Sequence, residues 1–261
     1  MARSRSTIAL AVAACAAALL AEGLVAFGSA RAHTLDARTL RSFLALGANG
    51  HLLTIATAVS HGLPAIVAVA TAALSVTALR QGRRAVALAV PAAIGGSVLS
   101  AELIKQLVAR PRHSSLLGLD QVSASSWPSG HATAAMITLL CALLVVGPRL
   151  RPLVALAGGA GVLLVACSML VLDAHYPSDV LGGLLLAGLW MSLTLAVLRR
   201  GPAPARLRAP AAATPVAVLA ALAAAAALAL LGVPIDGSLL AATATLALVA
   251  AALTGGVIAA A

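Results

Sequence analysis

Three short polar segments interrupt a chain that is otherwise rich in apolar residues. They are KQLVARPRH at 105–113, PSGH at 128–131 and HYPSD at 175–179. Together they contain three histidines, a carboxylate and several cations. Histidine gives and takes protons near neutral pH, whereas Lys and Arg bind phosphate oxygens. This combination of residue types indicates a site that handles a phosphate group.

The PSGH segment has the residues of a helix start that an anion can approach. Pro128 suits the first turn of a helix, and Ser129 and Gly130 leave the following backbone amides uncovered. The partial positive charge of the helix N-terminus then faces the anion. We expect Ser129 and Gly130 to bind phosphate, and we expect His131 to donate a proton to the leaving oxygen.

The HYPSD segment has the spacing of a carboxylate-oriented histidine. Pro177 marks a helix start, with His175 just ahead of it and Asp179 in its first turn. Asp179 can therefore accept from one ring nitrogen of His175 and leave the other nucleophilic. We expect Lys105 and Arg112 to bind the equatorial phosphoryl oxygens.

The elements that carry these segments are membrane-spanning helices. Of the 261 residues, 62% are hydrophobic and 9% are charged, well below the roughly 25% charged residues of a soluble domain. Arg3 and Arg5 before an apolar run also resemble a signal peptide, but the run at 7–30 is longer than the usual 7 to 15 residues or so, and we expect it to remain as a span. Eight spans are predicted, at about 7–28, 52–79, 85–108, 132–148, 153–172, 179–198, 212–232 and 239–260.

The distribution of charge predicts the topology. If the N-terminus is cytoplasmic, all seven acids fall in outer loops or outer halves of spans. Eleven of the seventeen basic residues then lie inside, as the positive-inside rule requires. These are Arg3, Arg5, Arg80, Arg83, Arg84, Arg149, Arg151, Arg199, Arg200, Arg206 and Arg208. The three polar segments then share the extracytoplasmic face.

Several other functions receive no support from the sequence. The net charge of +10 is explained by orientation and by contact with anionic membrane lipids, so we expect no nucleic-acid partner. Cys15, Cys141 and Cys167 lack ligand-like spacing, which predicts neither a disulfide nor a metal site. No charged residue lies near the middle of a span, which argues against a transporter. Glu102 lies one turn before Lys105, and we expect an ion pair between them.

Taken together, the three segments carry a resemblance to a known family. Lys105 and Arg112 are separated by six residues, PSGH follows at 128–131, and a third segment runs from Ser168 to Asp179. In order, spacing and side of the membrane they resemble the motifs of the type 2 phosphatidic acid phosphatase (PAP2) superfamily.

The resemblance covers about residues 50–200 and implies a mechanism. It implies that His175 forms a phosphohistidine intermediate, that Asp179 orients the ring and that His131 protonates the leaving group. It further implies that no metal or other cofactor takes part. The residues implied to hold the phosphate are Lys105, Arg112, Ser129 and Gly130.

The chain departs from the family pattern in two places. The residue after Arg112 is His113, where the family has proline, and the third motif begins Ser168-Met169 rather than Ser-Arg. Loss of one arginine contact to the transition state costs roughly 3 to 4 kcal/mol, or a factor of about 10² to 10³ in rate. Two alternatives stay open: an active phosphatase in which Arg110 compensates, and a catalytically impaired binding or structural membrane protein.

We therefore expect an all-α, polytopic transmembrane bundle. Its parts are a six-helix PAP2-like core at 1–200, with the catalytic motifs between 105 and 179, a basic cytoplasmic linker at 201–211 and a C-terminal transmembrane hairpin at 212–261. The hairpin either packs on the core or forms the interface of a homo-oligomer.

The expected site suits a phosphate whose apolar tail stays in the bilayer. We expect a lipid phosphate or pyrophosphate as the substrate. The resemblance adds polyprenyl pyrophosphate, phosphatidic acid, phosphatidylglycerol phosphate and a polyprenyl-phosphate sugar phosphate as candidates. The expected location is the cell membrane, with the N-terminus cytoplasmic and the active site extracytoplasmic.

Overall fold

The computed structural model describes residues 2–110 and 122–199, together with the short stretches 244–245, 248–249 and 252–254. Within these ranges the chain is helical and forms no strand. The helices are α1 Ala2–Gly28, α2 Ala30–Gly47, α3 Gly50–Arg80, α4 Arg84–Val108, α6 Gly130–Val145, α7 Arg151–Val171 and α8 Pro177–Leu198. The expected all-α fold is confirmed.

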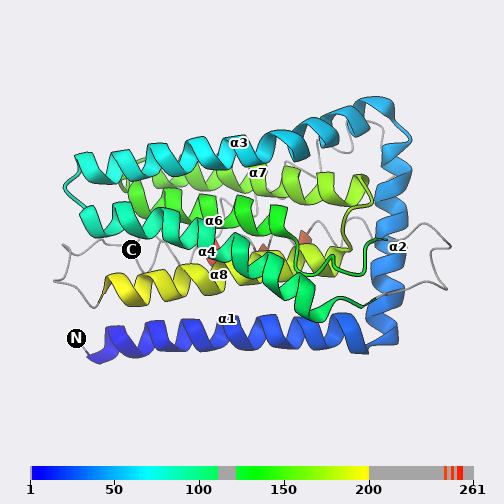
Figure 1. The fold of residues 1–261 in the computed structure, drawn as a ribbon, viewed down its shortest axis with the longest axis horizontal. Helices are drawn as coiled ribbons and strands as arrows, with labels where there is room; N and C mark the ends of the chain where they lie inside the picture. Colours follow the sequence, from blue (N-terminus) through cyan, green and yellow to red (C-terminus); the bar gives the residue numbers. More distant parts are fainter. Residues whose placement is uncertain (1, 111–121, 200–243, 246–247, 250–251, 255–261) are drawn as a thin grey trace.

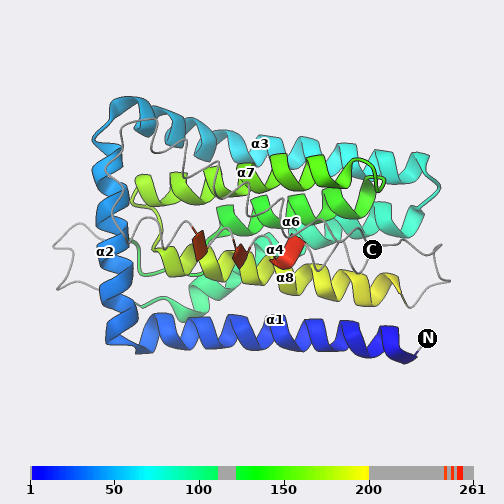
Figure 2. The same ribbon diagram turned by 180° about the vertical axis from the view of Figure 1, so that it is seen from behind.

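Among the described residues, five helices are long and apolar enough to cross a membrane. They are α1 from Ile8 onward, α3, α4, α7 and α8, which contribute 21 to 31 residues each. At 1.5 Å per residue these lengths correspond to about 30 to 47 Å, enough for the hydrocarbon core of a bilayer. The protein is therefore a multi-pass membrane protein. The long helices run side by side, with α1 packed on α8 and α3 packed on α4 and α7 (Figure 1, Figure 2).

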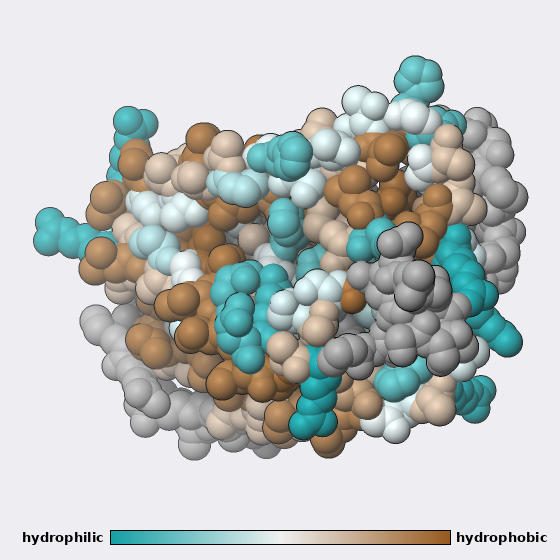
Figure 3. Space-filling view, turned by 45° about the vertical axis from the view of Figure 1, so that its right-hand side comes forward, coloured by the Kyte–Doolittle hydropathy of each residue, from teal (hydrophilic) through white to brown (hydrophobic). Residues whose placement is uncertain are grey.

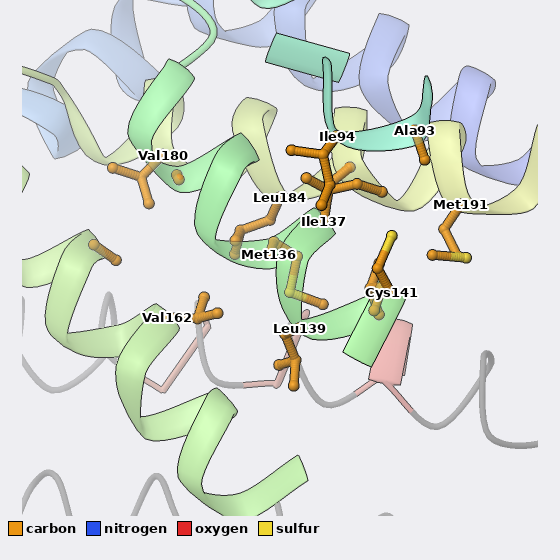
Figure 4. Packing of buried hydrophobic residues seen from close by; sticks show 14 of the residues in the cluster. Ala93, Ile94, Met136, Ile137, Leu139, Cys141, Val162, Val180, Leu184 and Met191 are labelled. Atoms are coloured by element: carbon orange, nitrogen blue, oxygen red, sulfur yellow. The ribbon is translucent and has the colours of Figure 1, made fainter. Parts of the chain in front are cut away.

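Helix α6 is the centre of the bundle. It has only 16 residues, about 24 Å, and is shorter than the predicted span at 132–148. Met136 and Ile137 have no exposed surface. In Figure 4 they lie among side chains of α4, α7 and α8, including Ile94, Val162 and Leu184. A helix surrounded by other helices needs no lipid contact along its length.

Helix α2 lies across one end of the bundle, roughly perpendicular to the long helices (Figure 1). It was not predicted, because it contains no long apolar run. Ser29 caps its N-terminus by accepting from the amide of Ala32 at 3.3 Å. One face of α2 is buried and contributes Leu40 and Phe43 to the core. The other face carries exposed side chains such as Arg38.

The two ends of the bundle differ in charge. The turns between α3 and α4 and between α6 and α7 lie at the end opposite α2 and are rich in arginine. Arg83 binds there to the last carbonyls of α6, donating from Nη1 to the oxygen of Leu144 at 3.1 Å. The acidic residues Glu22, Asp36 and Glu102 lie toward the α2 end. This asymmetry follows the charge distribution predicted from the sequence.

Large apolar side chains point outward along the bundle. Leu24, Leu88 and Leu107 are 75%, 73% and 83% exposed. In Figure 3, hydrophobic side chains cover much of the visible flank, and hydrophilic ones project beyond it at the left. A soluble protein would not leave so much contiguous apolar surface in water. This surface is suited to contact with lipid.

The linker at 201–211 and most of the predicted hairpin at 212–261 lie outside the described residues, so this division of the chain stays a prediction. Two described residues near the C-terminus, Val249 and Leu253, pack against the core. Leu253 lies over Gly188 of α8, where an added methyl group would come within 2.5 Å of it. At least this part of the C-terminal region contacts the core.

Candidate functional site

The PSGH and HYPSD segments meet at the α2 end of the bundle, where α6 and α8 begin. The backbone amide of Ser129 donates to the carbonyl of Asp179 at 2.8 Å. The hydroxyl of Thr133 donates to the carbonyls of Ser129 and Gly183, at 2.8 and 3.2 Å. Gly183 permits this approach, since a methyl group on it would lie 2.5 Å from the Ser129 carbonyl oxygen. The two helix starts are thus fixed against each other.

The structure refines the role expected for the start of α6. Pro128 precedes the N-cap residue Ser129 and so lies just outside the first turn. The Ser129 hydroxyl accepts from the amide of Ala132 at 3.4 Å, as an N-cap does. The amide of Ser129 is bound to Asp179, so it is Gly130 and His131 whose amides open the helix. These first-turn amides supply the positive end of the helix dipole.

His175 and Asp179 lie next to each other at the start of α8. His175 is 7% exposed and Asp179 is fully buried. The Nδ1 atom of His175 lies 3.5 Å from Oδ2 of Asp179 and has no hydrogen-bond partner among the described residues. Oδ2 accepts instead from the backbone amide of Tyr176, at 2.9 Å. The carboxylate is close enough to stabilise positive charge on the ring, and Nε2 is on the ring's opposite side.

His131 lies in the first turn of α6, at the α2 end of the bundle and ahead of the predicted span at 132–148. Its Nε2 atom is 3.4 Å from the hydroxyl oxygen of Ser60 on α3. Burial lowers the pKa of His131, and the charges of His175 and Lys105 lower it further, while hydrogen bonding to Ser60 and the charge of Glu102 raise it. A ring that holds its proton weakly gives it up readily to a leaving oxygen.

Lys105 reaches the start of α6 from the last turn of α4. Its Nζ atom binds Oε1 of Glu102 at 2.7 Å, so the expected ion pair is present. A methyl group on Gly130 would lie 3.4 Å from Lys105 Nζ and 2.8 Å from Glu102 Oε1. The absence of a side chain at Gly130 therefore leaves room for these two charged groups beside the helix N-terminus.

An apolar cavity of about 790 Å³ opens at the same place. Its polar end is formed by Glu102, Lys105, Gly130 and His131. From there it runs between α3, α4 and α6 along mostly apolar side chains and includes Pro64 of α3. A cavity with charged groups at one end and apolar walls along the rest suits an amphipathic ligand.

A family model for the PAP2 superfamily matches residues 85–201, which include Lys105, PSGH and HYPSD. This segment of the chain is similar to the PAP2 superfamily. The similarity indicates a phosphatase that acts on phosphate esters. No curated protein and no solved structure matches the chain.

Two cationic positions of the PAP2 pattern have different outcomes. Arg112 lies in the segment 111–121, outside the described residues, so its contact with phosphate stays a prediction. Met169 replaces the PAP2 arginine and is 1% exposed in the last turn of α7. Arg110 is exposed, and its backbone amide donates to the carbonyl of Ala124 at 3.1 Å. Whether its side chain compensates for Met169 also stays a prediction.

Residues outside the PAP2 match support both halves of the site, and sequence reasoning missed them. Asp36 of α2 binds the start of α8 through Ser178. Glu22 of α1 accepts from Nε1 of Trp127, just ahead of PSGH, at 2.8 Å. Trp127 also contacts Phe27 edge to face, with the ring centroids 5.8 Å apart. The sequence signal that could have revealed them was an acidic residue within an apolar helix, Glu22 in α1, and within an amphipathic helix, Asp36 in α2.

Among the described residues, no three His, Cys, Asp or Glu side chains are grouped so that they could hold a metal ion. The expectation of metal-independent chemistry stays a prediction. It enters the experiments below as a chelator control.

Proposed function

We propose that this PAP2 protein hydrolyses a lipid phosphate or pyrophosphate through a phosphohistidine on His175. One observation carries the proposal. The Ser129–Asp179 hydrogen bond joins the His175–Asp179 pair to the helix start that bears Gly130 and His131. A nucleophile, a proton donor and a phosphate-binding helix terminus thus belong to one cluster.

In the first step, Nε2 of His175 attacks phosphorus. The bond between phosphorus and the lipid oxygen breaks, and His131 gives its proton to that oxygen. The carboxylate of Asp179 stabilises the positive ring of His175. Lys105, Arg112 and the first amides of α6 stabilise the charge on the equatorial oxygens.

In the second step, water attacks the phosphohistidine. His131, now neutral, takes a proton from that water, and the bond between phosphorus and Nε2 breaks. Inorganic phosphate leaves and His175 is regenerated. Each proton given in the first step is recovered in the second, so the cycle requires no other proton carrier.

The apolar cavity supports a lipid as the substrate. Its walls between α3, α4 and α6 suit an acyl or polyprenyl chain, while the phosphate lies at the end formed by Lys105, Gly130 and His131. The candidate substrates therefore remain lipid phosphates and polyprenyl pyrophosphates. Soluble phosphate esters lack the part that would fill the cavity.

The charge asymmetry of the bundle supports an extracytoplasmic site in the cell membrane. Arg80, Arg83, Arg84 and Arg149 lie at the end opposite α2. Under the positive-inside rule this end is cytoplasmic, which places the N-terminus inside and the start of α6 and α8 outside.

One observation favours a second candidate, a phosphate-binding protein with impaired turnover. Met169 is buried and brings no charge to the site. In this case the cavity and Lys105 would still bind a lipid phosphate, but the transition state would lack one cation.

The test is phosphate release by the purified protein in detergent, with and without a metal chelator, over a panel of lipid phosphates and pyrophosphates. We expect release that chelator does not affect. The reaction with a ³²P-labelled phosphate ester is then quenched in base, because phosphohistidine is stable in base and labile in acid. We expect the ³²P label on the peptide that contains His175. Binding without release would favour the second candidate, and neither binding nor release would contradict both.

A further inference from the structure

Glu102 places a carboxylate beside Lys105 at the polar end of the cavity. Its Oε1 atom is 2.7 Å from Lys105 Nζ and would be 2.8 Å from a methyl group on Gly130. The Glu102 side chain is 54% exposed, and that of Lys105 is 14% exposed. The carboxylate therefore occupies the position of an anion on Lys105, at the helix start. It offsets the cation that would otherwise attract the substrate.

The position of Glu102 along the cavity decides which part of a substrate it meets. Glu102 lines the cavity together with Lys105, while His175 does not. A lipid tail in the cavity and a reacting phosphorus at His175 place the bond that breaks between these two points. The leaving group of the substrate therefore lies beside Glu102.

Monoesters and pyrophosphates differ in that leaving group. A lipid monophosphate releases an alcohol, which is neutral once it is protonated. A lipid pyrophosphate releases a lipid monophosphate, whose negative charge grows as the bond breaks. A carboxylate beside the leaving group repels the charged lipid monophosphate but not the neutral alcohol.

We propose that Glu102 is a specificity-determining residue that makes this site select lipid phosphate monoesters over lipid pyrophosphates. The inference rests on the proposed function, whose substrate class it narrows. The Glu102 carboxylate repels a charged leaving group at the polar end of the cavity, and the absence of a side chain at Gly130 leaves room for it there.

The test compares two substrates with one tail, farnesyl phosphate and farnesyl pyrophosphate, in the wild type, Glu102→Gln and Glu102→Asp. We expect the wild type to favour the monoester in kcat/KM. Glu102→Gln should raise kcat/KM for the pyrophosphate by about five- to tenfold relative to the monoester, since one half-exposed charge is removed. Glu102→Asp should keep the wild-type preference. The ratio of kcat/KM for the two substrates, measured in one preparation, does not depend on the fraction of folded protein.

Gln106→Lys is the matched control. It makes the same change in net charge from an exposed position that does not line the cavity. We expect it to leave the ratio unchanged. An equal effect of Glu102→Gln on both substrates, or the same shift in Gln106→Lys, would overturn the inference while leaving the proposed function intact.

A second readout separates this inference from turnover. If the wild type releases no phosphate, the proposed function fails, and calorimetric binding of inorganic phosphate and pyrophosphate then tests Glu102. If the Glu102 charge repels pyrophosphate selectively, Glu102→Gln strengthens pyrophosphate binding more than phosphate binding. Equal strengthening would overturn it.

Discussion

Asp36 binds Ser178 twice, although the two residues lie 142 positions apart in the chain. One carboxylate oxygen accepts from the Ser178 amide at 3.1 Å, and the other accepts from its hydroxyl at 2.6 Å. Asp36 is 6% exposed. Ser178 lies between His175 and Asp179, so α2 holds the turn that carries the proposed nucleophile.

Replacing Asp36 should therefore affect both stability and activity. Asp36→Ala leaves the Ser178 amide without this acceptor, which costs about 1 to 3 kcal/mol of unfolding free energy. We expect kcat to fall more than KM rises, because the cavity and Lys105 are unchanged. Denaturation in detergent and phosphate release measure the two effects. Thr34→Ala, which removes a hydroxyl bonded only within α2 at 2.9 Å, is the control. Equal behaviour of the two variants would contradict this role.

The contact between α6 and α8 predicts a strong effect at Gly183. A methyl group there would come within 2.5 Å of the Ser129 carbonyl oxygen, which is backbone and cannot rotate away. Gly183→Ala should separate the two helix starts and lower both thermal stability and phosphate release. Gly159→Ala is the matched change in a helix, since nothing lies within 4 Å of that position, and it should be neutral or slightly stabilising. Wild-type stability and phosphate release in Gly183→Ala would show that the contact between the starts of α6 and α8 is not rigid.

Met169 predicts a gain of function. Met169→Arg adds the charge that the PAP2 pattern has at this position, and we expect phosphate release to rise by up to about 10²-fold. Met169→Leu keeps an apolar side chain of similar size and should leave the rate near that of the wild type. Steady-state kinetics on one lipid phosphate measure the difference. A folded Met169→Arg protein with the wild-type rate would mean that another group already supplies this contact.

The lowered pKa of His131 predicts a pH dependence. As a proton donor His131 must be protonated, so kcat/KM should fall as pH rises through a value below the usual 6.5 of histidine. Glu102 raises this pKa, and Glu102→Gln should move the decline to lower pH. A depressed pKa in the folded state also means that stability is present above the unfolded value and is lost as pH falls through the folded one. If kcat/KM declines at the same pH in the wild type and in Glu102→Gln, the assignment of His131 as the proton donor is contradicted.

The apolar runs predicted the long helices well because a bilayer leaves the backbone no alternative to internal hydrogen bonds. Six of the predicted spans match α1, α3, α4, α6, α7 and α8 to within a few residues. The predicted fourth span was too long at its end. Helix α6 stops at Val145, because Gly147 and Pro148 follow and the residue before a proline disfavours helix.

Helix α2 and its contacts could not be read from hydropathy alone. Its buried residues Ala37, Leu40 and Phe43 follow helical spacing, so an amphipathic helix was predictable. Its position across the bundle, and the pairing of Asp36 with Ser178, depend on tertiary packing between distant segments. The motifs indicated which polar residues would gather, while the supporting contacts of Asp36 and Glu22 could be found only in the structure.

The central claim is that His175 is the nucleophile, and phosphate release by His175→Ala tests it most directly. The assay uses a lipid phosphate that the wild type hydrolyses, with folding checked by thermal denaturation in detergent. His61→Ala, at an exposed histidine of α3, is the control and should keep the wild-type rate. We predict that folded His175→Ala loses release by at least about 10³-fold. Release near the wild-type rate from folded His175→Ala would contradict the account.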